Sequence, residues 1–288
     1  MALLWKLEEY IRVSGMLFKL VLANERRSRI LEEKLRYGRN PQQYVLLFCP
    51  RDSAHRLRPL IFFLHGGGWG HGNPRMFRFI GRFFARAGYP VVLGGYRLAP
   101  LHRFPKQHQD AYAGLKAGLE LAARRGLRTD KVILAGQSAG AQLVSLMLLD
   151  RDSLRKNGFA PENFGGLLLI SGLLDYRYCR NAKDRSMLKN YLGKSSRWPV
   201  ADPIRYLQGD ESVPVLCLHG EEDPLVDKAN STSFVQKLNA NGRNLAELYL
   251  VKGSHHSDLT YMFLERLPVT ERMLAWLDER AGAAGKGK

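Results

Sequence analysis

Ser138 lies between two glycines, in the segment Gly136-Gln137-Ser138-Ala139-Gly140. The apolar run at 131–135 predicts a buried strand before it, and the spacing at 139–149 predicts a buried helix after it. A strand that turns into a helix so abruptly holds the residue at the turn in a strained conformation, with its side chain raised above the sheet. Glycine at both flanks removes side chains where strand and helix cross. The pattern predicts a nucleophilic serine at 138.

A serine hydroxyl is a poor nucleophile at neutral pH, so Ser138 needs a base and a carboxylate that orients the base. In a doubly wound sheet these groups follow later strands, in the order serine, acid, histidine. The predicted strand 213–219 leads into Gly220-Glu221-Glu222-Asp223-Pro224. Asp223 directly precedes a proline in this loop, and position alone leaves Glu221 and Glu222 open as alternatives.

Two adjacent histidines follow the next predicted strand, at 245–251. They stand in Gly253-Ser254-His255-His256-Ser257-Asp258. Neighbouring side chains point in different directions, so only one of the two histidines can reach Ser138. The residues alone do not decide between them.

Strands alternate with helical segments along the chain, which predicts a mostly parallel central sheet with helices on both faces. We expect an N-terminal amphipathic helix at 1–33 as a cap element and a catalytic domain at 34–281, followed by a disordered tail at 282–288. Within the domain, 34–38 and 44–48 are expected to form a hairpin. The stretch 171–212 departs from the alternation, and its aromatic residues predict a small helical cap.

The composition limits the classes of function. The chain has 288 residues, a formal net charge of +17 and only three cysteines, at wide spacings. The cysteine pattern favours neither a disulfide framework nor a zinc site and fits a reducing compartment. No signal peptide or membrane span is recognisable, so we expect a cytoplasmic protein. The basic charge is not accompanied by any nucleic-acid-binding signature.

Several motifs between Tyr37 and Leu259 together resemble those of the α/β-hydrolase superfamily. More narrowly, they are similar to those of the hormone-sensitive-lipase-like carboxylesterases and of their relatives, the arylformamidases and prenylcysteine methylesterases. The motifs are His65-Gly66-Gly67-Gly68-Trp69, Tyr96-Arg97-Leu98-Ala99-Pro100 with Phe104-Pro105, the elbow around Ser138, Ser171-Gly172-Leu173-Leu174-Asp175 and His219-Gly220-Glu221-Glu222-Asp223.

The resemblance implies a role for each matching position. His256-Ser257-Asp258-Leu259 resembles the His-Thr-Asp-Leu of the methylesterases, which favours His256 over His255 as the base. It also implies that His65 is structural and that Trp69 is a pocket wall or core residue. The implied set is Ser138 as nucleophile, Asp223 as orienting acid, His256 as base, and the backbone N–H groups of Gly67, Gly68 and Ala139 as oxyanion hole, with no cofactor or metal.

The implied function is a serine esterase that hydrolyses small or short-to-medium acyl esters through an acyl-enzyme. An arylformamidase-type amide hydrolase would use the same triad, so it stays open as an alternative. A non-catalytic binding protein on the same fold is a third reading, which the intact motifs disfavour. The expected partner is a small-molecule ester and not nucleic acid. Contact with a membrane surface is not favoured, and a homodimer is left open.

Two features bear on the substrate. Gly95 stands where the family usually has Asp or Asn, and Leu101 stands where the esterases commonly carry Glu. Between Ile61 and Gln109 there are seven Lys or Arg and no Asp or Glu. One hypothesis places Arg97, Arg103 and Lys106 on the approach to the site, where they would steer anionic esters. The alternative is a solvated helix face, formed by Arg75, Arg78, Arg82 and Arg86.

Overall fold

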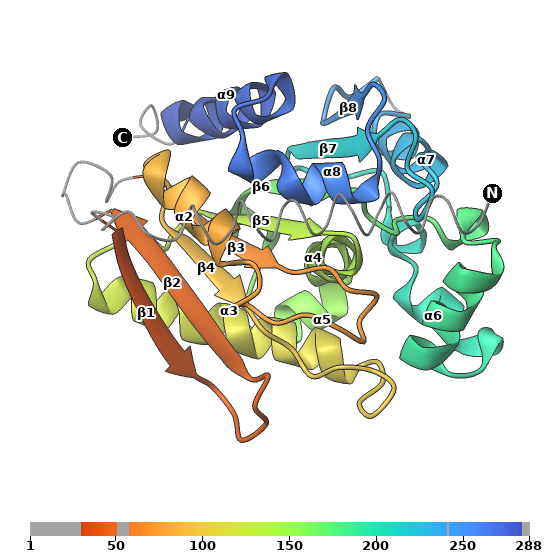
Figure 1. Cartoon of the computed structure of the whole chain (residues 1–288), viewed down its shortest axis with the longest axis horizontal. Helices are drawn as coiled ribbons and strands as arrows, with labels where there is room; N and C mark the ends of the chain where they lie inside the picture. Colours follow the sequence, from red (N-terminus) through yellow and green to blue (C-terminus); the bar gives the residue numbers. More distant parts are fainter. Residues whose placement is uncertain (1–29, 51–57, 241, 284–288) are drawn as a thin grey trace.

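One eight-stranded sheet organises the protein (Figure 1). The computed structural model describes residues 30–50, 58–240 and 242–283. The strands follow the spatial order β1 (Ile30–Arg36), β2 (Tyr44–Pro50), β4 (Val91–Gly94), β3 (Leu60–Leu64), β5 (Val132–Gln137), β6 (Phe164–Ile170), β7 (Val215–Gly220) and β8 (Ala246–Val251). β1 and β2 form an antiparallel hairpin and β2 pairs antiparallel with β4, while the pairs from β4 to β8 are parallel. The predicted mostly parallel sheet is confirmed.

Helices cover both faces of this sheet. One apolar cluster includes residues of α3 (Lys106–Arg124), α4 (Ala139–Leu149), α5 (Arg151–Lys156) and α7 (Ala229–Leu238). The other includes residues of α2 (Arg78–Arg86), α8 (His256–Tyr261) and α9 (Pro268–Ala283). Successive residues of β3 alternate between the two clusters. Both faces are therefore buried, which explains why the central strands are continuous apolar runs.

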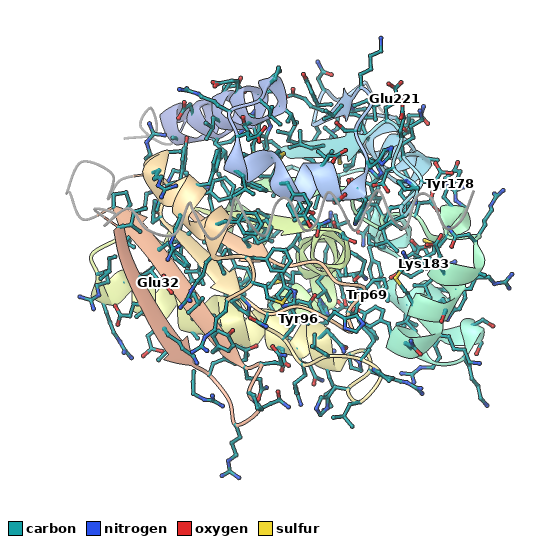
Figure 2. All side chains as sticks on the ribbon, in the orientation of Figure 1. Glu32, Trp69, Tyr96, Tyr178, Lys183 and Glu221 are labelled. Atoms are coloured by element: carbon teal, nitrogen blue, oxygen red, sulfur yellow. The ribbon has the colours of Figure 1, made fainter. Side chains whose placement is uncertain are left out.

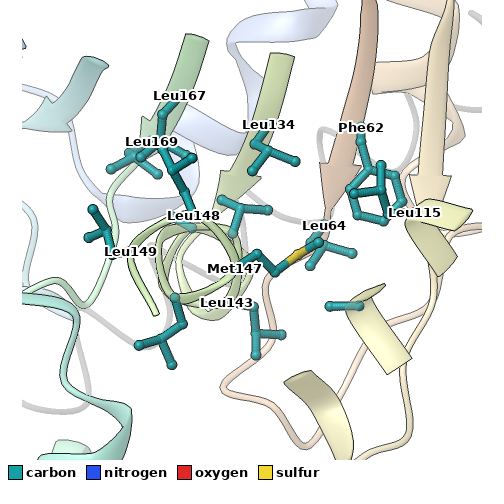
Figure 3. Close-up of a cluster of buried hydrophobic side chains, with 14 of the residues drawn as sticks. Phe62, Leu64, Leu115, Leu134, Leu143, Met147, Leu148, Leu149, Leu167 and Leu169 are labelled. Atoms are coloured by element: carbon teal, nitrogen blue, oxygen red, sulfur yellow. The ribbon is translucent and has the colours of Figure 1, made fainter. Parts of the chain in front are cut away.

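Helix α4 lies at the centre of the first cluster (Figure 3). All of its residues are buried, because it lies under α3, α5 and the cap as well as against the sheet. A helix enclosed in this way is apolar around its whole circumference and has no polar face. This burial fixes the helix that follows Ser138.

The stretch 171–212, expected as a small helical cap, contains helices and no strand. It contains α6 (Ala182–Leu192) and short 3-10 helices, among them Ser195–Ala201. The ring of Tyr191, from α6, stacks on Trp69 with 4.2 Å between ring centroids, and the backbone oxygen of Tyr191 accepts a hydrogen bond from Phe104 N at 3.0 Å. The cap is thus attached to the loops that follow β3 and β4.

The ends of the chain differ in detail from the expected boundaries. Residues 30–33, expected in the N-terminal helix, instead belong to β1 in the sheet, where Glu32 forms ion pairs with Arg78 and Arg82 of α2. The rest of that expected helix, 1–29, lies outside the described residues. At the other end α9 extends to Ala283, so the expected tail begins two residues too early, and 284–288 are outside the description. Among the described helices, none has the length and apolar character needed to cross a membrane.

The crossing of α4 over β3 yields a stability prediction. A Cβ atom on Gly140 would lie 2.0 Å from the backbone oxygen of Leu64, and backbone atoms cannot rotate away. Gly140→Ala should therefore lower the free energy of unfolding by about 2 kcal/mol or more, although alanine is ordinarily the better helix former. Urea unfolding of the purified variant measures the change.

Gly165→Ala is the matched control for this variant. A Cβ atom on Gly165 would meet its nearest neighbours at 3.9 Å, an ordinary contact distance. The control should stay within about 1 kcal/mol of the parent protein. Equal stability of Gly140→Ala and the parent protein would contradict the close crossing.

Candidate active site

Ser138 occupies the predicted strained turn between β5 and α4. Its backbone has φ 55° and ψ −119°, a left-handed conformation that non-glycine residues rarely adopt. The N–H of Ser138 donates to Ile170 O at 2.8 Å, which ties the turn to the end of β6. A Cβ on Gly136 would come within 2.5 Å of the Gly140 backbone, so only glycine allows strand and helix to approach this closely. The chain thus holds the serine side chain at the carboxyl edge of the sheet.

Asp223 lies in the loop after β7, and its side chain is fully buried. Its Oδ1 accepts hydrogen bonds from the backbone N–H groups of Leu225 and Val226, both at 2.9 Å. Its Oδ2 lies 2.7 Å from His256 Nδ1 and 3.4 Å from His219 Nε2. Burial alone would raise the pKa of Asp223, but the hydrogen bonds from the two histidines outweigh it and hold the pKa well below its usual range. The carboxylate is therefore ionised and fixed in place.

The two adjacent histidines point to different carboxylates. His256 is the first residue of α8, and its Nδ1 donates to Asp223. His255 precedes the helix, and its Nε2 lies 3.8 Å from Glu222 Oε2. The structure brings His256, and not His255, to Asp223. Glu222, one of the alternative acids, faces the other histidine.

Gln137 is a contact of this site that the sequence did not predict. Its Nε2 lies 3.1 Å from His256 Nε2. Because Nδ1 of the neutral ring donates to Asp223, Nε2 carries the lone pair and accepts from the amide of Gln137. The residue before the serine therefore engages the ring nitrogen that faces the cavity.

The glycine loop after β3 is held by His65. The His65 ring is buried between Phe77 and Tyr96, with centroid distances of 5.4 and 4.4 Å, and its Nδ1 donates to Gly66 O at 2.7 Å. Burial lowers the pKa of His65 to about 4, so the ring is neutral at physiological pH. These contacts give His65 a structural place beneath the loop.

The backbone of this loop faces the cavity. Gly67 and Gly68 both have positive φ, 113° and 57°, and both line the same cavity as Ser138. Within the described chain, their N–H groups have no hydrogen-bond acceptor. Ala139 is fully buried at the start of α4 and directly follows Ser138, but it is not itself among the lining residues. Trp69 is a core residue, because it is fully buried and donates from Nε1 to Gln142 Oε1 at 3.0 Å.

A cavity of about 600 Å³ contains Ser138 and His256. Its walls come from the glycine loop, the segment after β4, α6 and α8. The lining has one basic residue, Lys183 of α6 (Figure 2), and no acidic one. Apart from the glycines, Gln137, Ser138 and His256, the lining residues are His71, Phe77, Ala99, Pro100, Lys183, Met187, Asn190, Leu225, Val226, Ser257, Thr260 and Tyr261.

The cavity lining does not support the hypothesis that Arg97, Arg103 and Lys106 lie on the approach to the site. None of the three lines it. The Arg97 guanidinium binds the buried carboxylate of Asp110 through two hydrogen bonds of 2.7 Å, one to each oxygen. Asp110 is the first acidic residue after the stretch 61–109, and it is a buried residue of α3. Arg97 thus supports the loop and does not face substrate.

The two departures from the family pattern also lie away from the cavity lining. A side chain on Gly95 would place its Cβ 2.3 Å from Gln42 O, so the neighbouring backbone leaves no room for the usual Asp or Asn. Leu101 is 87% exposed on the loop surface. Neither residue shapes the cavity wall.

Comparison with known proteins identifies the family that has this architecture. The family described as alpha/beta hydrolase fold matches residues 61–259, which is more than half of the chain. The chain belongs to this family. The alpha/beta hydrolase fold also appears in esterase B from Lactobacillus rhamnosis, whose structure superposes with a TM-score of 0.78 at 23% identity, covering 99% of this chain and 97% of that one.

The curated relatives of this alpha/beta hydrolase are longer proteins. A probable isoprenylcysteine alpha-carbonyl methylesterase of Oryza sativa subsp. japonica is 26% identical over 242 residues, which are 77% of this chain and 56% of that protein. Esterase LipC of Mycobacterium tuberculosis is 24% identical over 246 residues, 80% of this chain and 60% of its own length. The chain therefore spans less than two thirds of the length of either relative.

A buried carboxyl behind the site generates a prediction of pH dependence. Asp184 of α6 is 2% exposed, and its Oδ1 has no hydrogen-bond partner among the described residues. Burial raises the pKa of Asp184 from 3.8 to about 6, and the negative charges of Asp223 and Asp227 add to the rise. Ionisation of this carboxyl therefore costs folding stability.

Asp184→Asn should stabilise this alpha/beta hydrolase at pH 8 and not at acid pH. The stability that the protonated carboxyl provides is fully present below pH 3.8 and is lost as the pH rises through about 6. The variant should gain about 2 kcal/mol in unfolding free energy at pH 8 and close to none near pH 4. Urea unfolding across this pH range measures the difference. Asp152→Asn, at a 73% exposed side chain, is the control, and an equal gain at both pH values would contradict the account.

Proposed function

We propose that this protein is a serine esterase that hydrolyses carboxylic esters through an acyl-enzyme. The observation that carries the proposal is the 2.7 Å contact between Asp223 and His256, at the cavity onto which the strained Ser138 opens. An ionised, buried carboxylate fixes the His256 tautomer and leaves Nε2 available as a base. The esterase names of the relatives and of the structural neighbour agree with this chemistry.

In the proposed reaction, His256 Nε2 takes the proton of Ser138 as the serine oxygen attacks the ester carbonyl carbon. For this step Ser138 must replace the Gln137 amide that now contacts Nε2. The carbonyl oxygen gains negative charge and accepts hydrogen bonds from the N–H groups of Gly67, Gly68 and Ala139. Each such donor contributes roughly 3 kcal/mol to the stability of the transition state in comparable enzymes.

The tetrahedral intermediate collapses when the bond to the alkoxy group breaks. His256 returns its proton to the departing alcohol, and the acyl group stays on Ser138. Water then attacks the acyl-enzyme with His256 again as base, which releases the carboxylic acid and restores the serine. The buried Asp223 stabilises the imidazolium in both steps.

The substrates that we propose are esters with a small or short-to-medium acyl group. A cavity of about 600 Å³ is within the usual range for small-molecule sites. Apolar side chains, among them Phe77, Met187 and Leu225, make much of its wall. Lys183 gives the rim a positive charge.

Three variants test the proposed roles. Ser138→Ala should lower kcat/KM for a short-chain aryl ester at least about 10⁴-fold, because it removes the hydroxyl that attacks the carbonyl carbon. His256→Ala should be damaging by a similar factor, whereas His255→Ala should stay within about tenfold of the parent enzyme. Steady-state kinetics on folded protein measures all three.

The amide alternative is tested by measuring turnover of an aryl formamide beside that of the ester, with the parent enzyme and the same three variants. The proposal predicts higher turnover of the ester. Higher turnover of the formamide, with the same dependence on Ser138, would move the substrate class to amides. Near-native ester turnover by Ser138→Ala would contradict the proposal. A larger loss of kcat/KM in His255→Ala than in His256→Ala would assign the role of base to His255.

A further inference from the structure

A second, basic groove lies on the other side of the cap helix from the catalytic cavity. It has a volume of about 430 Å³. Four of its seven lining residues are basic, and none is acidic. The lining comprises Arg103, Arg185, Lys189, Gly193, Lys194, Ser195 and Trp198.

The basic side chains come from separate segments that the fold brings together. Arg185 and Lys189 lie one turn apart on α6, and Lys194 follows the end of this helix. Arg103 comes from the loop after β4. It reaches the helix end at Gly193, where a Cβ atom would lie 3.6 Å from Arg103 Nη1. The fold thus gathers four like charges around one hollow.

Several arginines elsewhere in the described chain have carboxylate partners. Examples are the ion pairs of Arg58 with Asp278, Arg97 with Asp110 and Arg177 with Asp175. None of the four groove cations forms an ion pair with a described acidic residue. No carboxylate of the described protein therefore offsets their mutual repulsion through an ion pair.

The dipole of α6 explains only part of this arrangement. Lys189 and Lys194 lie near the carbonyl end of the helix, where the partial negative charge of the dipole favours a cation. Arg185 belongs to the first half of the helix, and Arg103 belongs to another segment. Neither owes its position to that dipole. An anion that enters the groove would offset all four charges at once.

We propose that this groove binds a phosphate-bearing anion. Arginine side chains offer planar pairs of N–H donors that match phosphate oxygens, and the lysines add compact positive charge. The volume of the groove is sufficient for a phosphate or pyrophosphate group with part of its substituent. The phosphate can belong to a free small molecule or to a lipid headgroup, since both present the same oxygens. This site is independent of the proposed ester hydrolysis.

The groove shares α6 with the catalytic cavity. Lys183, Met187 and Asn190 of this helix line the cavity, whereas Arg185 and Lys189 line the groove. Leu101, 87% exposed, is two residues from Arg103 on the neighbouring loop. A phosphate bound in the groove would therefore lie beside the cap, and a lipid headgroup there would bring the membrane surface close to an exposed apolar side chain.

Titration calorimetry with inorganic pyrophosphate tests the proposal, on the full chain and at fixed ionic strength. The parent protein should bind pyrophosphate saturably. Arg185→Gln/Lys189→Gln should weaken binding at least about tenfold, because two charge-assisted contacts are lost. Arg86→Gln/Lys156→Gln removes the same charge from exposed positions on α2 and α5 and should stay within about twofold.

Cosedimentation with vesicles distinguishes the two sources of phosphate. Vesicles of phosphatidylcholine alone are compared with vesicles that also contain phosphatidylglycerol. Binding to the anionic vesicles that requires Arg185 and Lys189, and that pyrophosphate displaces, assigns the groove to headgroups. Pyrophosphate binding without vesicle binding assigns it to free phosphates. Absence of saturable pyrophosphate binding, or an equal loss in both double variants, overturns the proposal.

Discussion

The close crossing of α4 over β3 and β5 is the constraint on which the candidate site depends. Gly136 and Gly140 allow backbone contacts that no Cβ atom could tolerate. The chain can then pass from strand to helix through one strained residue, Ser138, and the burial of α4 on all sides holds that strain. The same crossing sets the serine beside the glycine loop. Gly140, two residues after Ser138, lies against the backbone oxygen of Leu64, and Leu64 is the last residue of β3, directly before the glycine loop.

A second constraint is the fixed negative charge of Asp223. A buried carboxylate is stable only when hydrogen bonds replace the water that it has lost. Two backbone N–H groups hold one oxygen of Asp223, and His256 and His219 lie against the other. His219 is itself held by Ser231 and by the backbone oxygen of Val226. The orientation of His256 is therefore set by a network that extends into the core behind it.

The sequence could predict the parts of this arrangement that local rules determine. The elbow around Ser138 could be predicted because strand, turn and helix are contiguous in the sequence. The order of the strands placed the loops that carry Asp223 and the two histidines at the same sheet edge, and the family resemblance favoured His256. The contact between Gln137 and His256 spans 119 positions and depends on side-chain rotamers, which periodicity does not encode. The stacking of Trp69 on Tyr191 likewise joins two distant segments. The contact of Arg97 with Asp110 likewise depends on the fold, which brings α3 against the loop after β4.

The central claim is that Ser138 is the activated nucleophile of the cavity, and covalent labelling tests it most directly. A fluorophosphonate probe reacts with an activated serine and leaves a stable adduct that peptide mass spectrometry can locate. We expect stoichiometric labelling at Ser138 of the native protein, and no labelling of His256→Ala or of protein that is unfolded before the probe is added. A native protein that stays unlabelled, or that carries the label on a different residue, would contradict the claim.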